Sequence, residues 1–194
     1  YWVNKIMKKS DLAKLVEKVY YRFGSESAVQ CLDRIKKMGF YYATIGGLSF
    51  SVDDLLIPKS KPVMLEKAEK EVAKVEKQYQ EGIITNGERY NKVLSVWWNT
   101  SNDVAKAMYS ELEAQDKVSF LNEDHSEKPF NFVFLILESG ARGSKEQVRQ
   151  LAGMRGLMAK PTGEVMETPV KNNFKDGLTV FEYFVSTHGA RKGQ

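Results

Sequence analysis

Hydrophobic residues recur every three or four positions over most of the chain, which predicts helices. The first two are expected near the start, with apolar faces within residues 12–23 and 28–38. Ser10 is a suitable N-cap for the first helix, and Gly24 and Gly39 are suitable ends for the two. This region is therefore predicted to be a helical pair.

The segment from Phe40 to Leu56 has a different pattern, rich in aromatic and β-branched residues and interrupted by two glycines. It is expected to form short strands or irregular structure. Asp53 and Asp54 resemble a metal-binding pair at first sight. Because adjacent side chains on a strand point apart, a turn or a helix start is the better interpretation.

A narrow apolar seam typical of a coiled coil follows Pro62, and its members are Leu65, Ala68, Val72, Val75 and Tyr79. Gly82 ends this helix, and Thr85 with Glu88 has the form of a capping box that starts the next one. The second apolar run extends from Tyr90 to Leu112. The short connection predicts an antiparallel hairpin, with an arm ~25 Å long for residues 65–81.

The remaining third alternates loops with short elements. Residues 116–129 are polar and predicted to be a loop, whereas 130–137 is an apolar run that fits a buried strand or a buried helix. Ser144 is a predicted N-cap, and 161–163 a turn. The last helix is expected to start at Asn173 or Asp176. Its expected buried residues are Leu178, Phe181, Phe184 and Val185.

The predicted fold is therefore mainly α with short β or irregular segments. The order of segments is a helical and irregular part (1–62), a helical hairpin (63–115), a buried segment with glycine-rich loops (116–175), and a C-terminal helix (176–194).

The amino-acid composition excludes two kinds of structural site. Cys31 is the only cysteine, which excludes an intramolecular disulfide. The sequence also has no cluster of Cys or His residues, which excludes a zinc site. We therefore expect a reducing, cytoplasmic setting and no membrane span. The chain opens on Tyr1 without an initiator Met, which suggests a piece of something longer.

The net charge of +4 is uneven along the chain. Residues 1–138 hold 20 basic and 20 acidic side chains, so the remaining 9 basic and 5 acidic residues in 139–194 carry all of it. The same third holds 8 of the 14 glycines. Basic side chains among glycines suggest an anion-binding surface, with a solvated loop region as the alternative.

One motif in this basic third is a candidate phosphate site. In residues 139–144 an arginine, Arg142, lies between glycines just before a predicted helix start, where backbone amides are free to bind an anion. Arg149, seven residues on, is expected about two helical turns away on the same face. The spacing is not that of a P-loop, and a structural turn is the alternative.

No residue qualifies as catalytic or as a metal ligand. His125 lies in a polar segment, and His188 has no nucleophile or acid with a distinguishing context. No spaced trio of carboxylates marks a two-metal site. From its residues alone, the chain is a helical binding piece with an anion-friendly basic end.

Several longer strings are more specific, and in order and spacing they resemble the largest (β′) subunit of bacterial RNA polymerases. These strings are SGARGS at 139–144, QLAGMRGLMAKP at 150–161, ETP at 167–169, GLT at 177–179, EYF at 182–184 and STHGARKG at 186–193. Upstream, GERYNKV at 87–93 and Asp53-Asp54 with Ile57-Pro58 are also similar. The likeness covers residues 50–193 best.

The resemblance implies roles for these segments. The hairpin at 63–115 would be the rim helices of the secondary channel, and Arg142 and Arg149 would face the triphosphate of a nucleotide. The F-loop would comprise Met154, Arg155, Gly156, Leu157, Met158, Ala159, Lys160 and Pro161. The start of the bridge helix would comprise Thr187, His188, Gly189, Ala190, Arg191 and Lys192.

The resemblance also implies what surrounds the chain. The family's Mg²⁺ would be bound by residues outside this sequence, because the aspartate signature that holds it is absent, and this piece alone would be inactive. Expected partners are the other polymerase subunits (β, α, ω and sigma), template DNA, RNA and nucleoside triphosphates. An alternative is that the hairpin is a docking platform for secondary-channel regulatory factors. A free-standing nucleic-acid binder fits poorly with the neutral first 138 residues.

Overall fold

A computed structural model describes residues 7–121, 131–160 and 162–190 of the chain. The fold is mainly α-helical, as predicted, and only isolated β-bridges occur among the described residues. The chain divides into two compact units. The first comprises Tyr1–Asp54 with Lys128–Ser144, and the second comprises Leu55–Glu127 with Lys145–Gln194.

Helix α1 (Lys9–Gly46) of the first unit confirms the helical pair, because Gly24 inside it has non-helical angles, φ 82° and ψ 179°. Two boundaries differ from the prediction. The N-cap is Lys8 rather than Ser10, and the second helix continues past Gly39 to Gly46. The short strands or irregular structure expected from Phe40 are wrong for residues 40–46, which are helical, whereas the irregular alternative holds for residues 47–51. The low helix propensity of aromatic and β-branched residues is only a weak preference.

Two short elements complete the first unit. A 3-10 helix, η1 (Val52–Asp54), confirms a turn at the aspartate pair, where the Asp54 carboxylate accepts a 2.7 Å hydrogen bond from the amide of Ser51. The apolar run after residue 130 is a helix, α4 (Phe132–Ser139). Asn131 caps it by accepting from the amide of Phe134, and the Asn131 amide group donates to the carbonyl of Asp54 at 2.9 Å.

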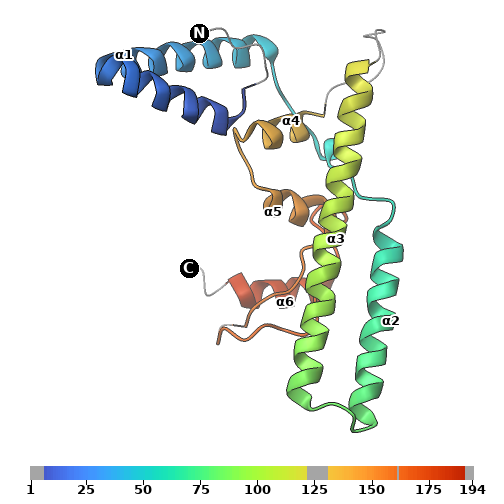
Figure 1. Ribbon diagram of the computed structural model, residues 1–194. Coiled ribbons are helices and arrows are strands. Elements are labelled where there is room, and N and C mark those ends of the chain that lie inside the picture. Colours follow the sequence, from blue (N-terminus) through green and yellow to red (C-terminus); the bar gives the residue numbers. More distant parts are fainter. Residues whose placement is uncertain (1–6, 122–130, 161, 191–194) are drawn as a thin grey trace. The chain divides into compact units, whose positions relative to one another are not determined.

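The second unit contains the predicted antiparallel hairpin, formed by α2 (Lys61–Gln80) and α3 (Asn86–Leu121) (Figure 1). The capping box is confirmed: the Thr85 amide donates to Glu88 at 2.8 Å, and the Glu88 amide donates to the Thr85 hydroxyl at 3.3 Å. Helix α3 continues to Leu121, so the loop predicted from residue 116 starts too early. Polar residues alone do not end a helix, and no Gly or Pro occurs between Gly87 and Pro129. His125 lies outside the described residues.

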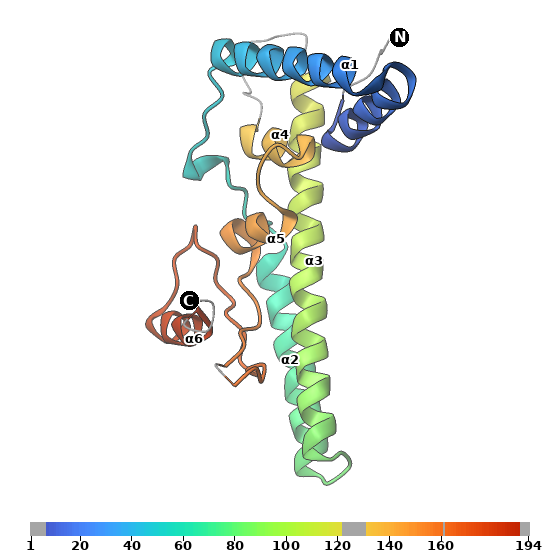
Figure 2. The same ribbon diagram turned by 90° about the vertical axis from the view of Figure 1, so that its left-hand side faces the viewer.

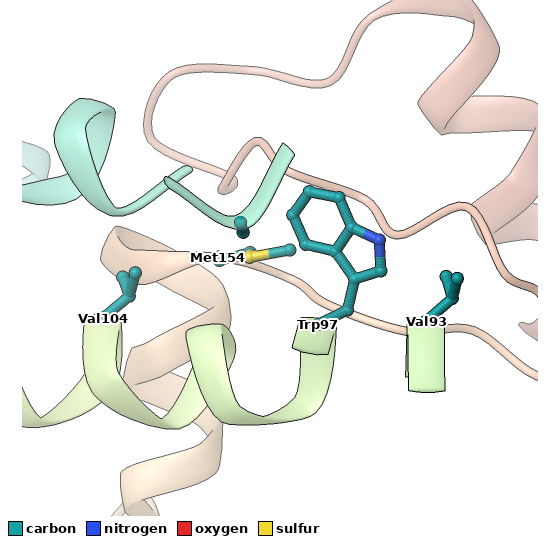
Figure 3. Close-up of a cluster of buried hydrophobic side chains, with 5 residues drawn as sticks. Val93, Trp97, Val104 and Met154 are labelled. Carbon is teal, nitrogen blue, oxygen red and sulfur yellow. The ribbon is translucent and has the colours of Figure 1, made fainter. Parts of the chain in front are cut away.

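The core of the second unit lies between the hairpin and the segment after α5 (Figure 3). Ala68 from α2 packs with three residues of α3, Val93, Trp97 and Val104, and with Met154 from the C-terminal third. Met154 and Val104 have no exposed surface, and Trp97 is 4% exposed. Burial of such side chains stabilises by ~2 kcal/mol each, so this cluster fixes the C-terminal segment on the hairpin.

The C-terminal third begins with α5 (Lys145–Val148), as expected from Ser144, and continues as a π-helical turn, η2 (Arg149–Gly153). Residues 156–170 then form a loop beside the hairpin, closed by isolated antiparallel bridges that pair Gly156 with Val170 and Ala159 with Val165 (Figure 2). The amide of Gly163 donates to the carbonyl of Lys160, which confirms the turn predicted there.

The last helix, α6 (Val180–Ala190), starts later than predicted. Asn173 and Asp176 form a turn with each other instead, and Thr179 with Glu182 makes the capping box. The expected burial of two aromatic residues is also wrong: Phe181 is 85% and Phe184 58% exposed. Periodicity identifies an apolar face, but the described residues supply nothing that covers this one.

Candidate functional site

The glycine turn that carries Arg142 connects α4 to α5. Helix α4 ends at Gly140, which has the left-handed angles φ 74° and ψ 16° that close a helix. Arg142 follows in an exposed turn and makes no hydrogen bond or ion pair to any described residue. The turn therefore presents a guanidinium group that no carboxylate of the described chain neutralises.

Arg149 has the opposite character, because its guanidinium is largely buried with its side chain 13% exposed. It donates to the Glu146 carboxylate through Nε at 3.0 Å and through a second nitrogen, and to the Ser101 hydroxyl and the carbonyl of Met154. The pKa of Glu146 is lowered, with the hydrogen bond from Arg149 as the main cause. These four hydrogen bonds leave one of the five N–H groups of Arg149 for another acceptor.

The predicted geometry between the two arginines is wrong. Helix α5 begins only at Lys145, so Arg142 precedes the helix and the expected two-turn spacing on one helical face does not exist. Arg142 belongs to the first unit and Arg149 to the second. The role of either residue in binding phosphate stays a prediction.

Gly156 supports the site around Arg149. Its φ of 92° lies in the region that favours glycine, and a Cβ built on it would lie 2.8 Å from a terminal nitrogen of Arg149 and 3.3 Å from the Ser101 hydroxyl. The backbone thus passes directly against the buried guanidinium. No side chain fits at this position without moving Arg149.

The segment expected to be an F-loop, residues 154–161, starts in the core and becomes exposed to solvent further along. Met154 and Gly156 are buried, whereas Ala159 and Lys160 are exposed, and Pro161 lies outside the described residues. The Arg155 guanidinium stacks 5.0 Å from the centre of the Phe174 ring, and burial lowers the pKa of Arg155.

The expected bridge-helix start lies at the end of α6, where Thr187, His188, Gly189 and Ala190 are helical. Arg191 and Lys192 lie outside the described residues.

A further set of hydrogen bonds joins the hairpin to the loop 156–170, at residues whose pairing no sequence motif indicates. Arg89 of α3 donates to both oxygens of Glu167, at 2.6 and 2.8 Å. The hydroxyl of Tyr90 donates to the carbonyl of Val165 at 2.8 Å. The paired residues are 78 and 75 positions apart, so no local pattern indicates the contacts.

The hairpin also has an open groove of about 570 Å³ between α2 and α3. Met64 and Ala68 line it from one helix and Val96, Thr100 and Ala107 from the other, with charged side chains at its edges.

Within the described ranges, no group of three or more His, Cys, Asp or Glu side chains is placed to hold a metal ion. Nor does any helix among those residues have the length and apolarity to cross a membrane.

Comparison with known proteins decides the family. The family described as RNA polymerase Rpb1, domain 4, matches residues 84–183, and the one described as RNA polymerase Rpb1, domain 3, matches residues 3–55. The chain belongs to the RNA polymerase Rpb1 family. The domain 4 match covers α3, the glycine turn, the loop 156–170 and the start of α6.

Curated relatives agree with this assignment. The DNA-directed RNA polymerase subunit beta′ of Sulfurihydrogenibium sp. (strain YO3AOP1) is 50% identical over 194 residues, which cover 99% of this chain and 12% of the relative. The same-named proteins of Thermodesulfovibrio yellowstonii and Leptothrix cholodnii are 50% and 45% identical over 98% of this chain and 14% of theirs. The chain therefore spans about an eighth of the length of these relatives.

Proposed function

We propose that this chain is part of the β′ subunit of a bacterial DNA-directed RNA polymerase and serves the nucleotide-addition cycle of transcription. The observation that carries the proposal is 45–50% identity over nearly the whole chain to proteins named as that subunit. The exposed aromatic face of α6 fits a piece whose apolar surface meets other parts of a larger enzyme. The other subunits, template DNA and RNA would be its partners.

Within that cycle, we assign Arg142 to the phosphates of the incoming nucleoside triphosphate. Its guanidinium is exposed, unpaired among the described residues, and held in a glycine turn that leaves room for a ligand. A guanidinium binds phosphate through two parallel N–H groups, and such charge-assisted bonds are about twice as strong as neutral ones. Arg142 would therefore raise nucleotide affinity without doing chemistry.

Arg149 contributes to the same proposal in a different way. Its guanidinium is bonded to Glu146, Ser101 and Met154, so a phosphate would compete with the Glu146 carboxylate for it. We assign to it mainly the placement of the loop that starts at Met154, with its remaining N–H facing an entering nucleotide. Replacing it would disturb packing as well as binding.

The test is Arg142→Ala in the intact polymerase. Loss of one charge-assisted bidentate contact is worth about 1.5–3 kcal/mol, so the nucleotide concentration for half-maximal elongation should rise about tenfold or more. Lys106→Ala is a matched control, because Lys106 is also an exposed cation and contacts only the nearby Asp103 among the described residues. Elongation at low nucleotide that is the same for Arg142→Ala and the control would refute the assignment.

By the same resemblance, a catalytic magnesium ion would be held by residues outside this sequence. Docking of secondary-channel regulatory factors on the hairpin stays a prediction. The groove between α2 and α3 offers a surface on which such a factor could dock.

A further inference from the structure

Among the described residues, the contact between Arg89 and Glu167 is the one bidentate ion pair between the hairpin and the loop 156–170. Two parallel hydrogen bonds, 2.6 and 2.8 Å long, join the guanidinium to the carboxylate. The Arg89 side chain is only 15% exposed. Glu76 of α2 lies 3.4 Å away on one side, and the guanidinium stacks 5.4 Å from the ring centre of Tyr79. Arg89 is thus held by both helices of the hairpin.

Two further contacts fasten the chain on either side of Glu167, one from within the loop and one from the residue that follows it. The Tyr90 hydroxyl donates to the carbonyl of Val165 at 2.8 Å. The Lys171 ammonium group donates to Glu69 of α2 at 2.7 Å and lies 5.4 Å from the ring centre of Trp97. The stretch from 165 to 171 is therefore attached to the hairpin at three successive points, of which the Arg89 contact is the only bidentate one.

The loop has little structure that would hold it in place by itself. Two isolated bridges join its two sides, at Gly156 with Val170 and at Ala159 with Val165, and the amides of Lys160 and Met166 donate to the carbonyls of Glu164 and Met158. Leu157 packs against the buried cluster on the hairpin. A two-stranded hairpin of this kind is marginally stable alone in water. Its position consequently depends on the hairpin. The pKa of Glu167 is lowered, chiefly by the hydrogen bond from Arg89, so the carboxylate is ionised at neutral pH.

We propose that Arg89 and Glu167 are positioning residues, a clamp through which the α2–α3 hairpin holds the loop 156–170 in the place that nucleotide addition requires. The inference rests on the proposed function and deepens it by adding residues that touch no substrate. Because the clamp acts on the loop rather than on a bound nucleotide, its loss should slow the step after binding. It should leave nucleotide affinity unchanged.

The first experiment measures the loop itself, by amide hydrogen exchange of the intact polymerase without nucleotide. In Glu167→Gln and Arg89→Gln enzymes, amides within 156–170, such as Met166 and Val170, should exchange about tenfold faster than in the parent. Glu66→Gln is the matched control, because it removes an exposed carboxylate whose partner, Lys70, is on the same helix. Its loop should exchange as in the parent.

The proposal also requires that Arg89 and Glu167 act through each other. In the double variant Arg89→Gln, Glu167→Gln, exchange should rise no further than in the more affected single variant, since either change already breaks the clamp. Arg89→Lys keeps the charge but not the two-pronged geometry, and should lie between the parent and Arg89→Gln. Unchanged exchange in the single variants, or additive effects in the double variant, would overturn the proposal.

The second experiment connects the clamp to the reaction, by single-nucleotide addition on preassembled elongation complexes. The maximal rate should fall several-fold in Glu167→Gln, with the half-saturating nucleotide concentration unchanged and the fraction of active complexes as in Glu66→Gln. A faster-exchanging loop with an unchanged maximal rate would overturn the positioning role. Failure of the proposed function would give a different result. The Arg142→Ala enzyme would then depend on nucleotide concentration as the parent does, while Glu167→Gln and Arg89→Gln would still speed amide exchange in the loop.

Discussion

Replacing Gly156 by alanine tests whether the loop is packed against the buried guanidinium of Arg149. The new methyl group would lie 2.8 Å from a terminal nitrogen of Arg149, which is too close, and 3.3 Å from the Ser101 hydroxyl, which is a tight contact. The backbone amide and carbonyl of Gly156 are paired with Val170 at 2.9 Å, so the backbone is not free to move away. The guanidinium must therefore give way.

The cost has two parts. An L-residue at a φ of 92° costs about 1–2 kcal/mol from the backbone alone. Moving Arg149 weakens its bonds to Ser101 and to the carbonyl of Met154, and a hydrogen bond to a charged group is worth about 1.5–3 kcal/mol. Because Arg149 keeps its bonds to Glu146, we expect about 3–4 kcal/mol in total rather than the full sum.

Gly177→Ala is the matched control, since Gly177 has a φ of 85° and no atom lies within 4 Å of the position that its new methyl group would take. Gly177→Ala should lose only the part of the unfolding free energy that comes from the backbone conformation. Urea unfolding is followed by the fluorescence of Trp97, which is buried in the core of the second unit, in chains where Trp2 and Trp98 are phenylalanine. If the two alanine variants lose the same free energy of unfolding within about 0.5 kcal/mol, the packing argument is refuted.

Two further predictions concern α6. Phe181→Ser should change the free energy of unfolding by less than about 0.5 kcal/mol, because Phe181 is 85% exposed, and should reduce self-association measured by light scattering. The pKa of Glu182 is lowered: burial raises it, but the hydrogen bonds it accepts from Asn172, Thr179 and Lys171 outweigh that effect. Its stabilising contribution should then be present at neutral pH and be lost as the pH falls below about 4, where glutamates titrate. Glu182→Gln should flatten the fall in urea midpoint between pH 5 and 3, and an unchanged slope would contradict this.

The parts of the fold that the sequence predicts well are those set by neighbouring residues. The hairpin follows from an apolar seam, a breaking glycine and the capping box of Thr85 with Glu88, all within one short stretch. The kink at Gly24 is equally local. The start of α6 has a local signal too, because Thr179 and Glu182 have the same capping-box spacing, but Asn173 and Asp176 offer competing cap residues just before it.

The candidate site is less predictable because its contacts join distant positions. The sequence suggests that Arg149 is available for phosphate, yet Glu146 three residues earlier takes two of its hydrogen bonds, and that i to i+3 spacing is a signal the sequence does contain. Its bond to Ser101 spans 48 positions and has no such signal. The same holds for the clamp between Arg89 and Glu167, which only the packing of the loop on the hairpin brings together.

The excess of positive charge in residues 139–194 looks different once each cation is placed. Arg149 is bonded to Glu146, Lys160 to Glu164 and Lys171 to Glu69. Lys145 and Arg155 lie over aromatic rings, and Lys175 donates to the carbonyl of Leu55. Among the described basic residues of this third, Arg142 alone has no such partner. A net charge counts all cations equally, but a cation without a partner in the fold is the most available to a phosphate. Nucleotide binding should therefore depend on Arg142 more than on the other cations of this third.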